Sequence, residues 1–121
     1  MKSHKDLDVW KSAMSLAKQV YENTQNYPKE ELYGLVSQMR RCAVSIPSNI
    51  AEGASRNSVK EFIQFLYIAT GSASELDTQI ELSQSIGIAD TDKLTQLQEH
   101  NTKVLMMLRG LIRSLKQQIN A

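Results

Sequence analysis

The sequence is poor in cysteine, proline and glycine: its 121 residues include one cysteine, two prolines and five glycines. A single cysteine excludes an internal disulfide and a zinc site built from several cysteines. So few prolines and glycines leave little room for the frequent turns of a β-rich protein. No apolar run approaches the roughly 18 residues of a membrane-spanning helix, and the first residues lack the apolar core of a secretory signal. We therefore expect a cytoplasmic protein that makes no contact with a membrane.

The sequence also lacks a large charge excess and an obvious catalytic set. Its 14 Lys and Arg residues nearly balance 13 Asp and Glu residues, which argues against a broadly basic nucleic-acid binder. Neither His4 nor His100 has a partner at the spacing of a metal site on helices. A glycine-rich phosphate loop is missing as well. We predict no catalytic residue, no metal, no cofactor and no enzymatic activity.

What the sequence does contain is helical periodicity in four segments, where apolar residues recur at steps of three and four. We predict an all-α protein with helices at about 7–25, 30–54, 59–85 and 92–118, forming one domain over residues 1–121. Short connections favour an antiparallel, up-down-up-down four-helix bundle.

The predicted core includes one stripe of the first helix and a polar residue of the fourth. Asn101 occupies a core-type position, where a buried asparagine more often fixes packing register than binds a ligand. Trp10 is expected in the core rather than at a ligand site. The predicted stripe of the first helix is Leu7, Trp10, Ala13, Met14, Ala17, Val20, Tyr21 and Thr24.

The second segment contains Pro47 in the middle of its periodic pattern. Its apolar residues keep the same phase on both sides of the proline, which favours one helix kinked at Pro47. The alternative is a break, with a new helix started by Asn49 and a reaching-back Glu52.

A long motif lies around this proline, Ser45-Ile-Pro-Ser-Asn-Ile-Ala-Glu-Gly53. Further residues accompany it: Tyr27-Pro28, Glu31, Tyr33-Gly34-Leu35, Gln38, Arg40-Arg41, Ala69-Thr-Gly-Ser72 and Glu75-Leu76. With these residues the chain resembles the four-helix-bundle proteins encoded in 23S rRNA intervening sequences, and the related accessory variability proteins of diversity-generating retroelements. The resemblance covers nearly the whole chain from Leu7 onward. It implies a ring-shaped homo-oligomer, often a homopentamer. It also points to RNA or DNA, or a reverse transcriptase-like protein, as a partner.

The third and fourth segments carry more apolar residues than one packing seam needs. Subunit association is the natural outlet for such an excess, because large apolar patches mark contact sites. The alternative is that these side chains cover loops or are singly exposed. The predicted interface residues are Ile63, Tyr67, Leu105, Met106 and Ile112.

An antiparallel bundle would also gather charges of one sign at each end. From Asn101 onward the chain has no Asp or Glu. The side chains of Arg109, Arg113 and Lys116 share one helical face, and the topology brings Arg56 and Lys60 to the same end. We predict these five as phosphate contacts. The alternative is a solvated basic face that keeps the protein soluble.

Arg40 and Arg41 are secondary candidates for phosphate contacts. Adjacent helical residues point about 100° apart, so one would contact the partner while the other pairs with Glu75 or Glu52. Two functions remain open: a nucleic-acid-binding oligomer, and a scaffold or adaptor that binds another protein.

Overall fold

In the computed structural model, which describes residues 3–120, the chain forms four long helices and no strand. They are α1 (Asp8–Thr24), α2 (Ser37–Ala54), α3 (Val59–Ile86) and α4 (Thr91–Asn120). The predicted all-α class and helical bundle are confirmed. Residues 1–2 and 121 of the predicted domain lie outside the described part of the chain.

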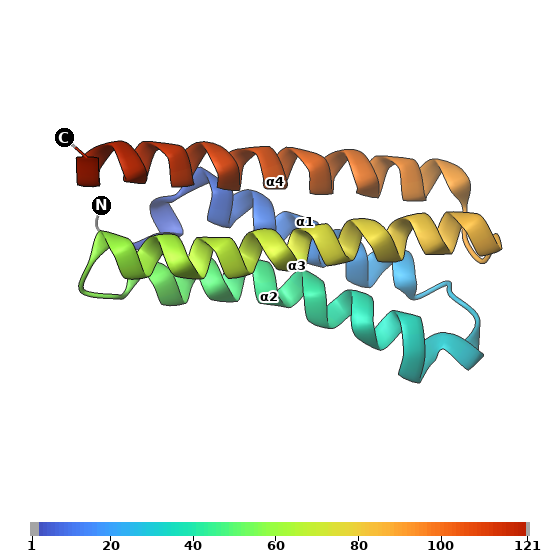
Figure 1. Cartoon of the computed structure of the whole chain (residues 1–121). Coiled ribbons are helices and arrows are strands. Elements are labelled where there is room, and N and C mark those ends of the chain that lie inside the picture. The colour runs from blue at the N-terminus through green and yellow to red at the C-terminus, as the bar shows by residue number, and fades with distance from the viewer. Residues whose placement is uncertain (1–2, 121) are drawn as a thin grey trace.

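The helices lie side by side, and Figure 1 shows consecutive helices running in opposite directions. Each helix packs on two others, because the contacting pairs are α1–α2, α2–α3, α3–α4 and α1–α4. All four contribute to a single core of buried apolar side chains, including Leu16, Ile46, Leu76 and Leu108. The chain start and the C-terminal end of α4 lie at the same end of the bundle (Figure 1).

Three of the predicted helix ranges agree with α1, α3 and α4 to within two residues at each end. The capping residues explain this agreement. The Ser58 hydroxyl accepts a hydrogen bond from the Glu61 backbone N–H at 3.2 Å, as a capping box requires. Gly87 ends α3 with φ of 70°, in the left-handed region that favours glycine. Asp90 Oδ1 accepts from the backbone N–H of Asp92 at 2.9 Å and so caps α4.

The segment before α2 departs from the predicted single helix over 30–54. It begins with a 3-10 turn at Lys29–Glu31, followed by a short π-helix at Leu32–Val36. Gly34 has φ −114° and ψ −106°, so the backbone leaves helical geometry there. Periodicity did not reveal the interruption, because Leu35 on its far side still reaches the core.

α2 itself continues through Pro47 to Ala54. The alternative of a separate helix beginning at Asn49 is therefore wrong. Asn49 instead lies inside α2, where its Nδ2 donates to the Ser45 carbonyl oxygen at 2.8 Å. This hydrogen bond lies close to Pro47, which has no backbone N–H to donate. The interruption of this segment lies upstream, at Gly34, and a bend at Pro47 stays a prediction.

The buried face of α1 is rotated from the predicted stripe. Ala13, Ala17, Val20 and Thr24 are buried as expected, but Val9 and Leu16 complete the face. Trp10 is only half-buried, and Met14 and Tyr21 are exposed. The physical reason is that α1 packs on both α2 and α4. The side chains that point toward these two helices lie on the same face of α1 as the buried Leu16.

α2 and α3 cross closely at Gly53. A Cβ atom at this position would lie 2.7 Å from Phe65 Cβ, 2.9 Å from Phe62 Cδ1 and 3.2 Å from the Phe62 carbonyl oxygen. A hydrogen bond of 2.9 Å between the Ser45 and Ser72 hydroxyls joins the same two helices. Ser45 and Gly53 of the motif therefore serve the packing of α2 on α3.

α4 is fixed to α3 by the predicted core asparagine. Asn101 is 1% exposed, and its Nδ2 donates to the Ala73 carbonyl oxygen at 2.8 Å. None of the helices in residues 3–120 combines the length and the apolar character that crossing a membrane demands.

We expect Gly53→Ala to destabilise the fold by about 1–3 kcal/mol, because the added methyl overpacks the α2–α3 crossing. Gly71→Ala is the matched control. A Cβ atom at Gly71 meets nothing within 4 Å, so the better helix former should stabilise α3 by up to about 1 kcal/mol. Urea unfolding followed by circular dichroism measures both. Equal stability of the two variants would contradict this account of the crossing.

Candidate nucleic-acid interface

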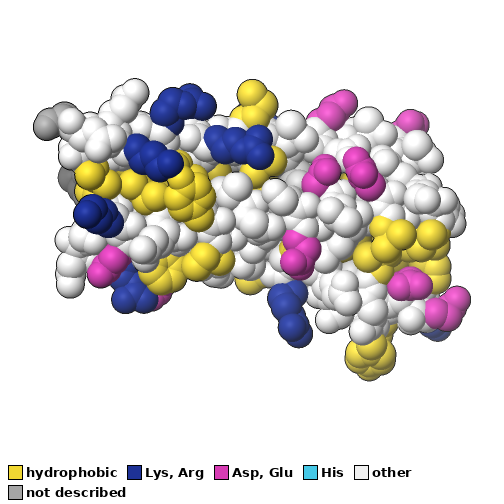
Figure 2. Space-filling model, viewed as in Figure 1, with side chains coloured by type: hydrophobic (Ala, Val, Ile, Leu, Met, Phe, Trp, Pro, Cys, Tyr) yellow, Lys and Arg dark blue, Asp and Glu magenta, His cyan; other side chains and the backbone are white. Residues whose placement is uncertain are grey.

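Basic side chains gather at the end of the bundle that holds the C-terminus of α4. Figure 2 shows Lys and Arg mostly over that half of the visible face, and Asp and Glu mostly over the other half. The separation follows from the antiparallel path, because the acid-free second half of α4 returns to the turn between α2 and α3. We call five of the exposed basic residues at this end the basic pole: Arg56, Lys60, Arg109, Arg113 and Lys116.

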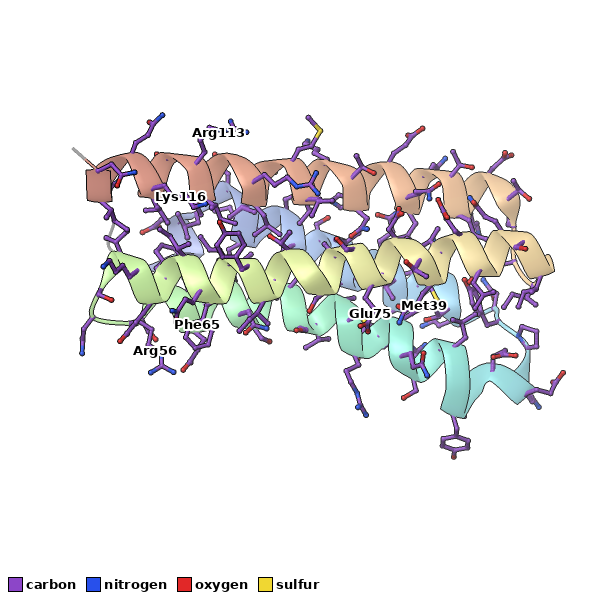
Figure 3. The ribbon with its side chains drawn as sticks, viewed as in Figure 1. Met39, Arg56, Phe65, Glu75, Arg113 and Lys116 are labelled. Carbon is purple, nitrogen blue, oxygen red and sulfur yellow. The ribbon has the colours of Figure 1, made fainter. Side chains whose placement is uncertain are left out.

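Two arginines of the basic pole are free of carboxylates. Arg109 and Arg113 are exposed on α4, and within residues 3–120 the one ion pair is formed elsewhere, between Arg56 and Glu52. Figure 3 shows the Arg113 side chain pointing away from the bundle. Both guanidinium groups can therefore contact an incoming anion without breaking an existing pair.

Lys116 is held against an aromatic ring. Its Nζ lies 5.2 Å from the centroid of the Tyr67 ring on α3. Beside this pair, α3 and α4 enclose a groove of about 370 Å³. The groove is lined by Lys60, Ile63, Gln64, Lys116, Ile119 and Asn120.

Arg56 is the most constrained of the five. Its Nη2 donates to Glu52 Oε1 at 2.8 Å, and its guanidinium carbon lies 4.8 Å from the Phe65 ring centroid. Figure 3 shows Arg56 and Phe65 together near the start of α3. Because Glu52 neutralises its charge, Arg56 is a weaker candidate for binding an anion than Arg109 or Arg113.

Arg40 and Arg41 lie outside the basic pole. Arg40 Nε donates to Thr24 Oγ1 at 3.0 Å, and its guanidinium carbon lies 4.6 Å from the Tyr21 ring centroid. The expected pairing of one arginine with Glu75 or Glu52 is therefore wrong. Glu75 accepts from a cysteine and Glu52 pairs with Arg56, while Arg41 remains exposed.

The five predicted interface residues divide into two groups. Ile63 and Ile112 are 7% and 5% exposed, and they belong to the core of the chain itself. Leu105 is half-buried, whereas Tyr67 and Met106 are exposed. Ile63 and Ile112 were predicted to contact another subunit, but they belong to the core of the chain. Of the five predicted interface residues, only Tyr67 and Met106 are well exposed.

The larger apolar surface lies where the sequence predicted core. Two adjoining grooves of about 490 and 460 Å³ run along α1, α2 and the π-helix, and both include Tyr21 and Val44. We call them the apolar trough. Its large apolar side chains are Trp10, Met14, Tyr21, Leu32, Tyr33 and Val44. A rotation of the buried face of α1 exposes half of this set, and periodicity alone does not resolve such a rotation.

A polar cluster joins α2 to α3 on the acidic half. Cys42 Sγ donates to Glu75 Oε2 at 2.7 Å, and Gln79 Nε2 donates to Cys42 Sγ at 3.4 Å. Burial, and then the hydrogen bond to Glu75, raise the pKa of the Cys42 thiol to about 11. The thiol is therefore protonated at neutral pH and is a poor nucleophile.

His100 joins α4 to α1. Its Nδ1 lies 2.7 Å from Gln19 Oε1, and its Nε2 lies 3.4 Å from Ser12 Oγ. Burial, and then the charge of Lys103, lower the pKa of His100 below its ordinary value. The neutral ring positions the two helices. Across residues 3–120, no three His, Cys, Asp or Glu side chains come together as a metal site.

Comparisons with known proteins agree with this architecture. A family model described as 23S rRNA-intervening sequence protein matches residues 5–110. A crystal structure of a protein with unknown function, from the S23 ribosomal protein family of Bacteroides thetaiotaomicron VPI-5482, matches with a TM-score of 0.81. The alignment covers 87% of this chain and 95% of the other at 22% identity, a likeness that shows the fold. No curated protein matches this chain.

We expect Cys42 to react with iodoacetamide at pH 8 about a hundredfold more slowly than an ordinary thiol. The reason is that raising the pKa from 9.0 to about 11 lowers the reactive thiolate fraction at that pH. The rate should keep rising as the pH approaches 11. Mass spectrometry follows the alkylation, and the same chain unfolded in urea is the control. Equal rates for the folded and unfolded chains would contradict the assignment.

Proposed function

The chain belongs to the 23S rRNA-intervening sequence protein family, and from this premise we propose a non-enzymatic, oligomeric bundle of the cytoplasm that binds RNA or DNA without reading its sequence. The observation that carries the proposal is the pair of exposed arginines on α4, Arg109 and Arg113, which pair with no carboxylate of residues 3–120. Lys116 and Lys60 extend the same positive surface across to α3.

The proposed chemistry is phosphate neutralisation. Each Lys or Arg that contacts a phosphate displaces condensed counterions, so binding weakens as salt is raised. Phosphate contacts of this kind fix a protein on its ligand but carry no sequence information directly. Binding by the basic pole would therefore depend on charge and not on base sequence.

Self-association would multiply this weak contact. In a ring, each subunit adds a basic pole, and one strand could touch several poles at once. The apolar trough supports such association, because exposed apolar surface of this extent favours burial. We assign its occupant as a second copy of the chain.

A complementary surface exists on the chain itself. Along one face of α3 the exposed residues include Ile68, Glu75 and Leu82. This stripe carries apolar side chains and a carboxylate, whereas the trough carries apolar side chains and Arg41. A contact between two different surfaces is head-to-tail and can close into a ring.

The trough also favours the second candidate function, a scaffold or adaptor for another protein such as a reverse transcriptase-like enzyme. That function needs an apolar docking surface that self-association leaves free. A protein partner that remains bound after nuclease treatment would support it, and a partner lost on nuclease treatment would favour the nucleic-acid function.

We expect mixed-sequence RNA to bind most tightly at low salt. The triple variant R109Q/R113Q/K116Q should lower the slope of log affinity against log salt by about 2, since each lost contact removes about 0.7. The control K29Q/K93Q removes positive charge away from both the basic pole and the apolar trough and should keep the slope. Fluorescence anisotropy at four salt concentrations measures both. Absence of binding at low salt, or equal slopes in the two variants, would reject the proposal.

We expect the purified chain to be an oligomer at micromolar concentration. M14E and V44E should each dissociate it, because a charge in the apolar trough opposes burial. M106E is the control, since Met106 is 65% exposed on α4 outside the trough. Sedimentation velocity gives the mass. A monomeric wild type would refute the association, and dissociation by M106E alone would return the interface to α4.

A further inference from the structure

We propose that the basic pole selects unpaired nucleotides, and that one base stacks on the ring of Tyr67. This inference rests on the proposed nucleic-acid function and adds to it a substrate class and a contact residue. Its starting point is an aromatic side chain that is 47% exposed and lies beside Lys116 of the basic pole.

Tyr67 is placed for stacking by the helices on both sides of it. On α3 it lies one and two turns beyond Ile63 and Lys60, on the same face. Across from it on α4, Lys116 Nζ lies 5.2 Å from the ring centroid. Stacking of a base on an aromatic side chain is stronger than an exposed cation–π contact of this kind, so a base can displace the ammonium group.

The displaced ammonium group would then be free for a phosphate. Lys116 also lines the adjoining groove of about 370 Å³, with Lys60 among the other lining residues. The apolar lining of this groove includes Ile63 and Ile119, and its polar lining includes Gln64 and Asn120. Apolar atoms suit the face of a base, and amides suit its edge. Ring, groove and lysines together fit a nucleotide with its base turned out.

The two phenylalanines of α3 are less available, and Phe62 packs against the core. Phe65 is half-buried, and the guanidinium of Arg56 lies over it while Glu52 holds that guanidinium in place. Tyr67 is therefore the aromatic ring of α3 that a base can reach. A duplex keeps its base faces stacked inside and would offer only phosphates to this surface, leaving Tyr67 unused. Unpaired strands gain both the phosphate contacts and the stack.

The test compares a 20-nucleotide mixed-sequence RNA with a fully paired duplex of the same sequence, using the full chain and fluorescence anisotropy. We expect the single strand to bind about tenfold more tightly at equal salt. Tyr67→Leu should weaken single-strand binding by about tenfold and leave the salt slope unchanged, because the substitution removes a stack and no charge. Tyr67→Phe keeps the ring face and should bind as the wild type does.

The matched control is Met106→Leu. Met106 is 65% exposed on α4 outside the apolar trough, so it tests whether altering any exposed apolar side chain has this effect. It should leave the affinity unchanged. Circular dichroism and sedimentation of each variant establish that fold and mass are retained.

Equal affinity for single strand and duplex, with Tyr67→Leu silent, would overturn this inference and leave the phosphate contacts of Arg109 and Arg113 standing. Dissociation of the oligomer by Tyr67→Leu would also overturn it, because Tyr67 would then be a subunit contact. If no nucleic acid binds at low salt, the proposed function itself fails, and the inference fails with it.

Discussion

The close crossing of α2 and α3 is the contact on which the arrangement of this molecule depends. Gly53 lets the two backbones approach to a distance that any side chain would prevent, and the turn that follows is short. The crossing fixes the start of α3 beside the end of α2, and so it sets where Arg56 and Lys60 lie relative to the returning α4. The motif around Pro47 thus serves the fold through Gly53, while Pro47, Ser48 and Ala51 also line the apolar trough.

Two surfaces of different character result, and they occupy different helices. The basic pole is formed mainly by α4 and the first turns of α3, whereas the apolar trough follows α1, α2 and the π-helix. Because the two share no residue, a subunit can bury the trough against a neighbour while the basic pole stays open to solvent. Polar contacts such as Asn101 with Ala73 hold the long helices in register between these surfaces.

Sequence patterns predicted the helix boundaries well because the residues that start and end each helix act locally. The capping box at Ser58 and the left-handed Gly87 act within a few residues of themselves. Sequence patterns were less informative about features that depend on how distant parts of the chain pack together. Whether Met14 or Leu16 is buried depends on the angle at which α1 meets α2 and α4, and the break at Gly34 leaves the apolar phase intact. Charge placement at the basic pole followed from topology, but the pairing of Lys116 with Tyr67 required side-chain positions.

The central claim is that nucleic acid lies on the basic pole and not on the trough. Photo-crosslinking a 4-thiouridine-containing single-stranded RNA to the intact chain, with the crosslinked residues mapped by mass spectrometry, tests it most directly. We expect crosslinks in residues 56–67 and 109–116. Crosslinks confined to the α1–α2 face, or none under conditions where the RNA is bound, would contradict the account.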